Sequence, residues 1–315
     1  MTAAAAAVLA SAAYQEAAAA RDRRRFPAPG RMVDIGGRRL HLLDAGAASP
    51  AVVVVPALGD SALLWASIQR DLAADMRVCV YDRAGLGWSD PPPRGSRTIN
   101  DAARELHALL DSAGIEPPYV LVGHSAGGVI ARRFATSHPG TVAGLVLVDS
   151  SHEDQAGRHG VHGWPYSRSV YLRRALRRQL RILGARRLAA ALGLLRELDA
   201  DIAREVPAEH AAAYRASMLS TRQKRIVVRE TLMMARLSEQ PPSLGAIPLT
   251  VITAGGQRLA GWREMQDELA ALSTSSTHIT AEGSGHYVHL DDPELVLHAI
   301  RDLVRESRRL MPGRC

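Results

Sequence analysis

From residue 31 onward, short apolar runs alternate with longer segments that have a helical pattern. The first two runs, Met32–Ile35 and Arg39–Asp44, flank Gly36-Gly37 and predict a β-hairpin. Four consecutive valines in the run Ala51–Pro56 predict a strand that is buried on both faces. Four more runs are of this kind, namely Arg77–Asp82, Tyr119–Gly123, Val142–Asp149 and Leu249–Ala254, and a last run, Thr277–Ala281, precedes the final helix.

Helical patterns occupy the intervals between these strands. They cover Ala62–Leu72, Asn100–Ala113, Ala126–Ser137, Trp262–Leu272 and Pro293–Leu310. Regular strand–helix alternation predicts an α/β fold whose sheet is mostly parallel, with helices on both faces. The hairpin at the start would make this eight-stranded sheet mixed at one edge.

Residues 151–243 interrupt the alternation, because they contain no clear strand and several arginine-rich helical stretches. An insertion of this length between two strands predicts a helical cap over the carboxyl edge of the sheet, where ligands bind in open α/β folds. The predicted organisation is an N-terminal extension over 1–30, an α/β core over 31–150 and 244–310, and a cap over 151–243.

The N-terminal extension begins with an alanine-rich run that is weakly apolar and too short to span a bilayer. The basic stretch Arg21–Arg25 follows this run, whereas a signal peptide carries its positive charge in front. We therefore expect a solvated or surface-lying helix and a cytoplasmic protein. Membrane association through residues 1–25 is the alternative, and the arginine-rich cap helix with Leu172, Leu176, Leu180 and Leu183 on one stripe could also meet an anionic surface.

The net charge of +7 raises the question of a nucleic-acid partner. The surplus is almost wholly arginine, and neither zinc-finger spacing nor aromatic residues interleaved with basic ones are present, so we expect no nucleic-acid binding. Cys79 lies within a predicted strand and Cys315 is the last residue, so the two cysteines do not form a disulfide framework.

The sequence Gly123-His124-Ser125-Ala126-Gly127 joins a predicted strand to a predicted helix. A serine between glycines in such a turn is the G-x-S-x-G pattern of a nucleophile elbow. A serine hydroxyl needs a base to become nucleophilic at neutral pH. Of the 12 histidines, His286 is the best candidate, because a glycine-containing loop after the last strand can project it over the sheet edge toward Ser125.

With these motifs in this order, residues 31–310 resemble the α/β-hydrolase superfamily. The segment Tyr81–Asp90 is similar to the family's D-R-x-G-x-G-x-S loop, which we interpret as structural. The family's oxyanion donor follows the third strand, usually in an H-G-x-G sequence, and the matching Pro56–Gly59 lacks the His-Gly pair. Because the donors are backbone amides, the resemblance implies an oxyanion hole formed by the N–H groups of Leu58 and Ala126.

The third member of the triad departs from the family pattern. No carboxylate follows the predicted strand Leu249–Ala254, whose continuation is Gly-Gly-Gln-Arg. Some family members carry the acid after the sixth strand instead, and Asp149 occupies that position here. Glu153, Asp154 and a Ser–His dyad remain alternatives.

We therefore expect a serine hydrolase that acts on a small-molecule carboxylic ester with an apolar part, without a metal or organic cofactor. Serine at the elbow argues against the epoxide hydrolases and haloalkane dehalogenases of this fold, which place Asp there. The irregular spacing of His152, His159 and His162 is more typical of solvated side chains than of a metal site. Thioester, lactone or C–C bond cleavage, cofactor-free haloperoxidase chemistry and a non-catalytic binding module stay open as alternatives.

Overall fold

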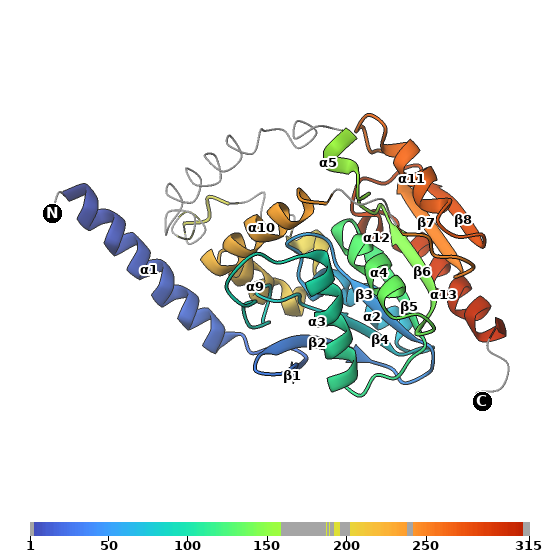
Figure 1. Ribbon diagram of the computed structural model, residues 1–315. Helices are drawn as coiled ribbons and strands as arrows, with labels where there is room; N and C mark the ends of the chain where they lie inside the picture. The colour runs from blue at the N-terminus through green and yellow to red at the C-terminus, as the bar shows by residue number, and fades with distance from the viewer. Residues whose placement is uncertain are drawn as a thin grey trace.

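Eight strands form one sheet in the order β1-β2-β4-β3-β5-β6-β7-β8 (Figure 1). The computed structural model describes residues 3–158, 187, 189, 192–195, 202–237 and 242–310. The strands are β1 Arg31–Asp34, β2 Arg39–Ala45, β3 Ala51–Val55, β4 Val78–Tyr81, β5 Tyr119–His124, β6 Val142–Val148, β7 Leu249–Ala254 and β8 Ser276–Ala281. Strand β2 is antiparallel to both β1 and β4, and all other pairs are parallel. The predicted mixed sheet is confirmed.

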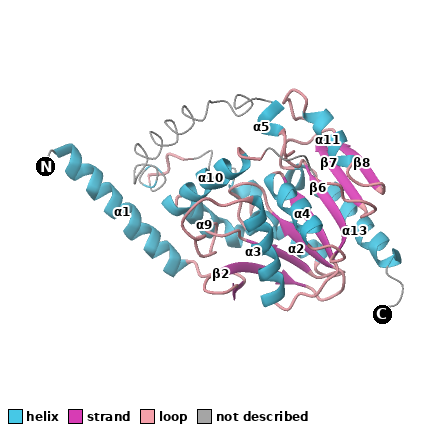
Figure 2. Cartoon of the chain, viewed as in Figure 1, coloured by secondary structure: helices cyan, strands magenta, loops and turns pink. Residues whose placement is uncertain are grey.

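Helices cover both faces of the sheet (Figure 2). The core helices are α2 Ala66–Leu72, α3 Ile99–Ser112, α4 Ala126–Ser137, α11 Trp262–Ala270, α12 Val288–Asp291 and α13 Pro293–Leu310. One apolar layer packs α3, α4 and α11 on the sheet, and the other packs α2 and α13 on the opposite face.

The valine run of β3 shows why apolar residues are consecutive in these strands. Val53 and Val55 belong to the layer under α3 and α4, whereas Val52 and Val54 belong to the layer under α2 and α13. Successive side chains of a strand point to opposite faces, so a strand between two helical layers needs apolar residues at every position.

Local signals account for the helix boundaries. Thr98 and Asp101 form a reciprocal capping box at the start of α3. The helical pattern predicted over Ala62–Leu72 is divided into two elements, because the 3-10 turn η1 Ala62–Trp65 precedes α2. Ser61 caps this turn by accepting from Leu63 N.

The N-terminal helix α1 Ala3–Arg25 extends from the body of the protein (Figure 1). Its second half is anchored, since Ala18 and Ala19 are buried and Gln15 Nε2 donates to Leu219 O over 2.8 Å. Leu9 and Tyr14 are exposed on its outer part. No helix in the described part of the chain is long and apolar enough to cross a bilayer.

Within the range predicted as a cap, the described elements are α5 Gln155–Arg158, α9 Ala208–Met218 and α10 Thr221–Met234. Helix α10 lies against the loops that follow β3 and β4. Its Val227 and Ile226 side chains would be 2.7 and 2.6 Å from a Cβ atom built on Gly59 and Gly85, respectively. The predicted helix with Leu172–Leu183 lies outside the described residues.

Candidate active site

Ser125 occupies the turn between β5 and α4 with φ of 52° and ψ of −123°, a positive φ that is rare for a residue with a side chain. Glycines stand at positions 123, 127 and 128 around this turn, because other atoms approach the chain closely there. A Cβ on Gly127 would be 2.0 Å from Val55 O, and one on Gly128 would be 2.0 Å from Ser150 Oγ. The glycines allow the strained turn that projects Ser125 beyond the carboxyl end of β5.

Asp149 follows β6, the strand next to β5, and also has a positive φ of 40°. In this pairing His124 lies opposite Val148, so Ser125 and Asp149 leave neighbouring strand ends. The Asp149 carboxylate is fully buried, and its Oδ1 accepts hydrogen bonds from Ala254 N at 3.0 Å and Trp262 Nε1 at 2.8 Å. Two fixed donors therefore orient this carboxylate.

The other oxygen of Asp149, Oδ2, is 2.6 Å from Nδ1 of His286. A carboxylate can only accept, so Nδ1 carries the proton. In neutral His286 this leaves Nε2 as the free acceptor, which is the tautomer that a general base requires. The His286 side chain is 34% exposed, whereas Asp149 is inaccessible to solvent.

The main-chain carbonyl of His286 is hydrogen-bonded to the strand that leads into the serine turn. His124 Nε2 lies 2.9 Å from His286 O, and the two rings are 4.9 Å apart between centroids. Burial, together with the neighbouring His289 and His286, lowers the pKa of His124 well below its usual value. His124 is therefore neutral, with its one N–H on Nε2 donated to that carbonyl.

Leu58, Ser125 and Ala126 line one cavity of about 40 Å³. Ala126 is the first residue of α4, where amide groups have no partner within the helix. The remaining lining residues are Ser151, His152, Gln155 and Met234, the last from α10. Both amides proposed as oxyanion donors thus belong to residues that line the same small space as the serine.

The alternative acids have other partners. Glu153 is buried and accepts from Arg132 at 2.8 Å, and Asp154 pairs with Arg158 at 3.0 Å. Of the carboxylates weighed for the triad, Asp149 is the one that the structure brings to His286.

Sequence reasoning missed the donors that hold Asp149. Trp262 was predicted only as the start of a helix, and Ala254 only as the end of a strand. No local pattern marks either as a partner of a residue more than a hundred positions away.

The histidine cluster at the start of the cap is described only in part. His152 Nε2 lies 3.3 Å from Glu268, whereas His159 and His162 lie outside the described residues. In the part of the chain that the structure describes, no group of three or more His, Cys, Asp or Glu side chains is arranged to hold a metal ion.

Comparison with known proteins agrees with this architecture. Residues 50–293 match the family model for the alpha/beta hydrolase fold. The uncharacterized protein YqjL of Bacillus subtilis is 26% identical over 263 residues, which are 82% of this chain and 85% of YqjL. An esterase from Thermogutta terrifontis superposes with a TM-score of 0.62 at 22% identity, covering 88% of this chain and 98% of the esterase.

Other similarities are partial. The Hormonema carpetanum protein named "Probable transporter efuK" is 38% identical over 129 residues, which are 39% of this chain but 18% of that protein. The family match extends over most of the core, and so this chain belongs to the α/β-hydrolase family and is a hydrolase of that fold.

Proposed function

We propose that the chain is a serine hydrolase that cleaves a carboxylic ester through an acyl-enzyme on Ser125. The observation that carries the proposal is the 2.6 Å hydrogen bond between His286 Nδ1 and the buried Asp149, with Ser125 on the neighbouring strand end. This pairing supplies an oriented base, and the main chain of that base is hydrogen-bonded to His124, the residue before the serine of the elbow.

In the proposed reaction, His286 Nε2 takes the Ser125 hydroxyl proton as Oγ attacks the ester carbonyl. The Leu58 and Ala126 amides stabilise the oxyanion of the tetrahedral intermediate, and Asp149 stabilises the imidazolium. The intermediate expels the alcohol, which receives its proton from His286. Water then gives a proton to His286 and attacks the acyl carbon. The second tetrahedral intermediate expels Ser125 Oγ, which receives that proton from His286, and the acid is released.

The cavity beside Ser125 supports a short acyl group. One water molecule needs about 10–15 Å³ of such volume, so about 40 Å³ accommodates only a few heavy atoms. Leu58 and Met234 contribute apolar surface to this space. We infer that acetyl or butyryl esters are preferred to long-chain esters.

The reason to consider a non-catalytic module was the missing carboxylate after β7. The Asp149 carboxylate at the end of β6, 2.6 Å from His286, supports the catalytic alternative instead.

Hydrolysis of p-nitrophenyl acetate, butyrate and decanoate tests the proposal, together with labelling by a fluorophosphonate. We expect turnover that is highest for the short esters, labelling of the wild-type protein, and loss of both in Ser125→Ala. Folded wild-type protein that neither turns over nor labels at Ser125 contradicts the proposal. Phenyl thioesters and aliphatic lactones are assayed in parallel, and a higher kcat/KM on either replaces the ester assignment with that chemistry.

A further inference from the structure

The loop that carries Leu58 is held by a buried arginine from the segment after β4. Arg83 is 1% exposed, and its Nη1 and Nη2 donate to Pro56 O at 2.5 Å and to Ala57 O at 2.6 Å. The sequence pattern suggested only a structural role for this segment. The guanidinium therefore donates hydrogen bonds to the two carbonyls that immediately precede the Leu58 amide.

The orientation of the Leu58 amide follows from planar peptide geometry. The Ala57 carbonyl and the Leu58 N–H belong to one peptide unit, which is trans in this chain, so the two bonds point in opposite directions. With the carbonyl oxygen fixed on Arg83, the N–H points away from Arg83. The Ala57 oxygen also accepts from Asp60 N at 3.1 Å, which closes a turn whose third residue, Gly59, has φ of 80°.

A carboxylate from α10 completes the arrangement. Glu230 is 3% exposed and accepts from Arg83 through both oxygens, Oε1 from Nε at 2.7 Å and Oε2 from Nη2 at 2.8 Å. Its Oε2 also accepts from Gly59 N at 3.0 Å, and Gln223 Nε2 of the same helix donates to Gly59 O at 2.6 Å. The loop is thus hydrogen-bonded to Arg83 on the core side and to α10 on the cap side.

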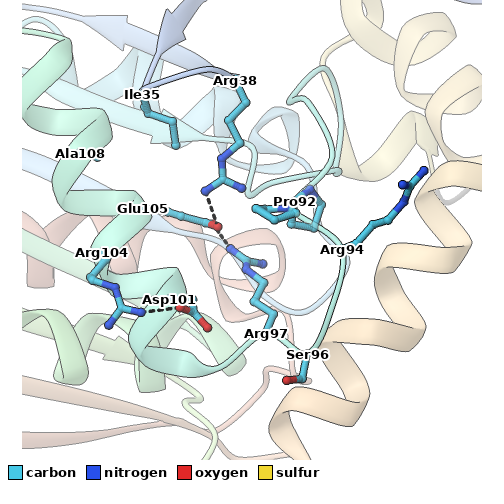
Figure 3. Close-up of a pocket in the computed structure, with 11 residues that line it drawn as sticks. Ile35, Arg38, Pro92, Arg94, Ser96, Arg97, Asp101, Arg104, Glu105 and Ala108 are labelled. Carbon is cyan, nitrogen blue, oxygen red and sulfur yellow. Dashed lines mark hydrogen bonds and ion pairs between the residues drawn. The ribbon is translucent and has the colours of Figure 1, made fainter.

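Further charges keep Glu230 ionised. Burial raises its pKa, but the charge of Arg83 and the hydrogen bonds from Arg83 outweigh burial, and the pKa is lowered overall. Arg97 Nη1 is 3.7 Å from Glu230 Oε1, and Arg97 also pairs with Glu105, on which Arg38 converges at 2.7 Å (Figure 3). A series of ion pairs thus connects the Leu58 loop to a surface cavity. Arg38, Arg97 and Glu105 line this cavity.

We propose that Arg83 and Glu230 are positioning residues that aim the Leu58 N–H at the oxyanion, so that a helix of the predicted cap completes the oxyanion hole. This inference rests on the proposed function. Neither side chain touches the reacting atoms, and both act through the Ala57–Leu58 peptide and Gly59. Loss of this alignment weakens an interaction that matters most in the transition state, so it lowers kcat more than it raises KM.

The test compares Glu230→Gln, Arg83→Lys and the paired apolar replacement Arg83→Met/Glu230→Leu with the wild-type protein on p-nitrophenyl butyrate. We expect kcat to fall about 10- to 100-fold in each, as for a slightly misplaced catalytic group, with KM changed less than about threefold. The affinity for phenylboronic acid, whose tetrahedral adduct resembles the oxyanion, should fall by a similar factor.

The paired replacement separates positioning from simple ion pairing. Exchanging both members of a buried ion pair for apolar groups often preserves stability. We expect this variant to remain folded but to unfold at a lower temperature, because the Pro56 carbonyl and the Gly59 N–H lose their buried partners. It should keep the low kcat, because the Pro56 and Ala57 carbonyls lose the Arg83 donor. Return of kcat to the wild-type value in this variant overturns the inference, as does a kcat within about threefold of wild type in folded Glu230→Gln and Arg83→Lys.

Asp44→Asn is the matched control. Asp44 accepts from Arg77 through both oxygens, at 3.0 and 2.8 Å, and Arg77 lies at the amino end of β4, opposite to the carboxyl edge that carries Ser125. We expect this variant to keep the wild-type kcat.

Amide hydrogen exchange of Gly59, whose N–H donates to Glu230 Oε2, gives a readout without turnover. It should be faster in Glu230→Gln than in the wild type and in Asp44→Asn, and unchanged exchange overturns the inference. A wild-type protein without ester turnover contradicts the proposed function alone, since the exchange experiment still reports whether Arg83 and Glu230 hold the loop.

Discussion

Asp149 and His286 are 137 positions apart in the chain and are joined by a hydrogen bond of 2.6 Å between Oδ2 and Nδ1. Asp149 follows β6 and the His286 loop follows β8, and β7 lies between these two strands in the sheet. The amide of Ala254 at the end of β7 and the indole of Trp262 hold the other carboxylate oxygen. A residue after β6 thereby takes the place that the family usually gives to one after β7.

Replacement of Asp149 by Asn should lower kcat on p-nitrophenyl butyrate by about 10⁴-fold, because an amide no longer enforces the Nδ1–H tautomer or stabilises the imidazolium. Asp154→Asn is the control, since Asp154 pairs with Arg158 and not with His286. An Asp149→Asn variant with nearly wild-type kcat would mean that the carboxylate has only a structural role.

Replacement of Trp262 by Phe should lower kcat by roughly 10-fold or more, since a hydrogen bond to a charged group contributes about 1.5–3 kcal/mol. An aromatic ring remains, but the five-membered ring of the indole is lost together with its Nε1 donor to Asp149. Trp88→Phe is matched to it, because Trp88 Nε1 donates to Phe26 O, where α1 joins the core. Equal kcat values for the two variants contradict the assigned role of the indole.

Replacement of Gly127 by Ala should destabilise the fold by more than about 2 kcal/mol, because the new Cβ would be 2.0 Å from Val55 O. Gly283→Ala should be nearly neutral, since a Cβ there meets no atom within 4 Å and no positive φ is imposed. Thermal unfolding followed by circular dichroism measures both. The packing argument fails if the two variants unfold at the same temperature.

Asp60 should make the protein less stable as the pH rises from about 4 to 7. Burial raises the pKa of Asp60 to about 7 in the folded protein, against the opposing charge of Arg83, from a reference value of 3.8. Between these values the folded state holds a proton that the unfolded state releases, so the contribution of Asp60 to stability falls as the pH rises.

Asp60→Asn removes this titration. The unfolding free energy of the wild type should therefore decline relative to the variant by up to about 1.4 kcal/mol per pH unit in this window. Urea unfolding at pH 5, 6, 7 and 8 measures the difference. Parallel pH profiles for the two proteins contradict the raised pKa.

The local signals in the sequence were sufficient for the strands, the main core helices and the candidate nucleophile, but not for the 3-10 turn η1 or the short helix α12. Each strand between two helical layers requires consecutive apolar residues, as in Val52–Val55, and this requirement is visible in any short window. The Ser125 turn is likewise local, because the glycines that allow its backbone lie within a few residues of it.

Local sequence signals narrowed the choice of the carboxylate of the triad but did not complete it. Asp149 was predicted from its place at the end of a strand, while Glu153 and Asp154 remained alternatives a few residues away. Their partners, Arg132 and Arg158, could not be assigned by spacing.

The sequence by itself therefore determined the α/β architecture and the candidate serine, histidine and acid, since periodicity, glycine turns and motif order are properties of neighbouring residues. Only the tertiary structure decided that Trp262 donates a hydrogen bond to Asp149. It also decided that Arg83 and Glu230, 147 positions apart, pair with each other and form hydrogen bonds to the Leu58 loop. The physical reason is that a hydrogen bond depends on ångström-scale placement of whole elements. That placement results from packing summed over the two apolar layers, and no single segment of the chain encodes it.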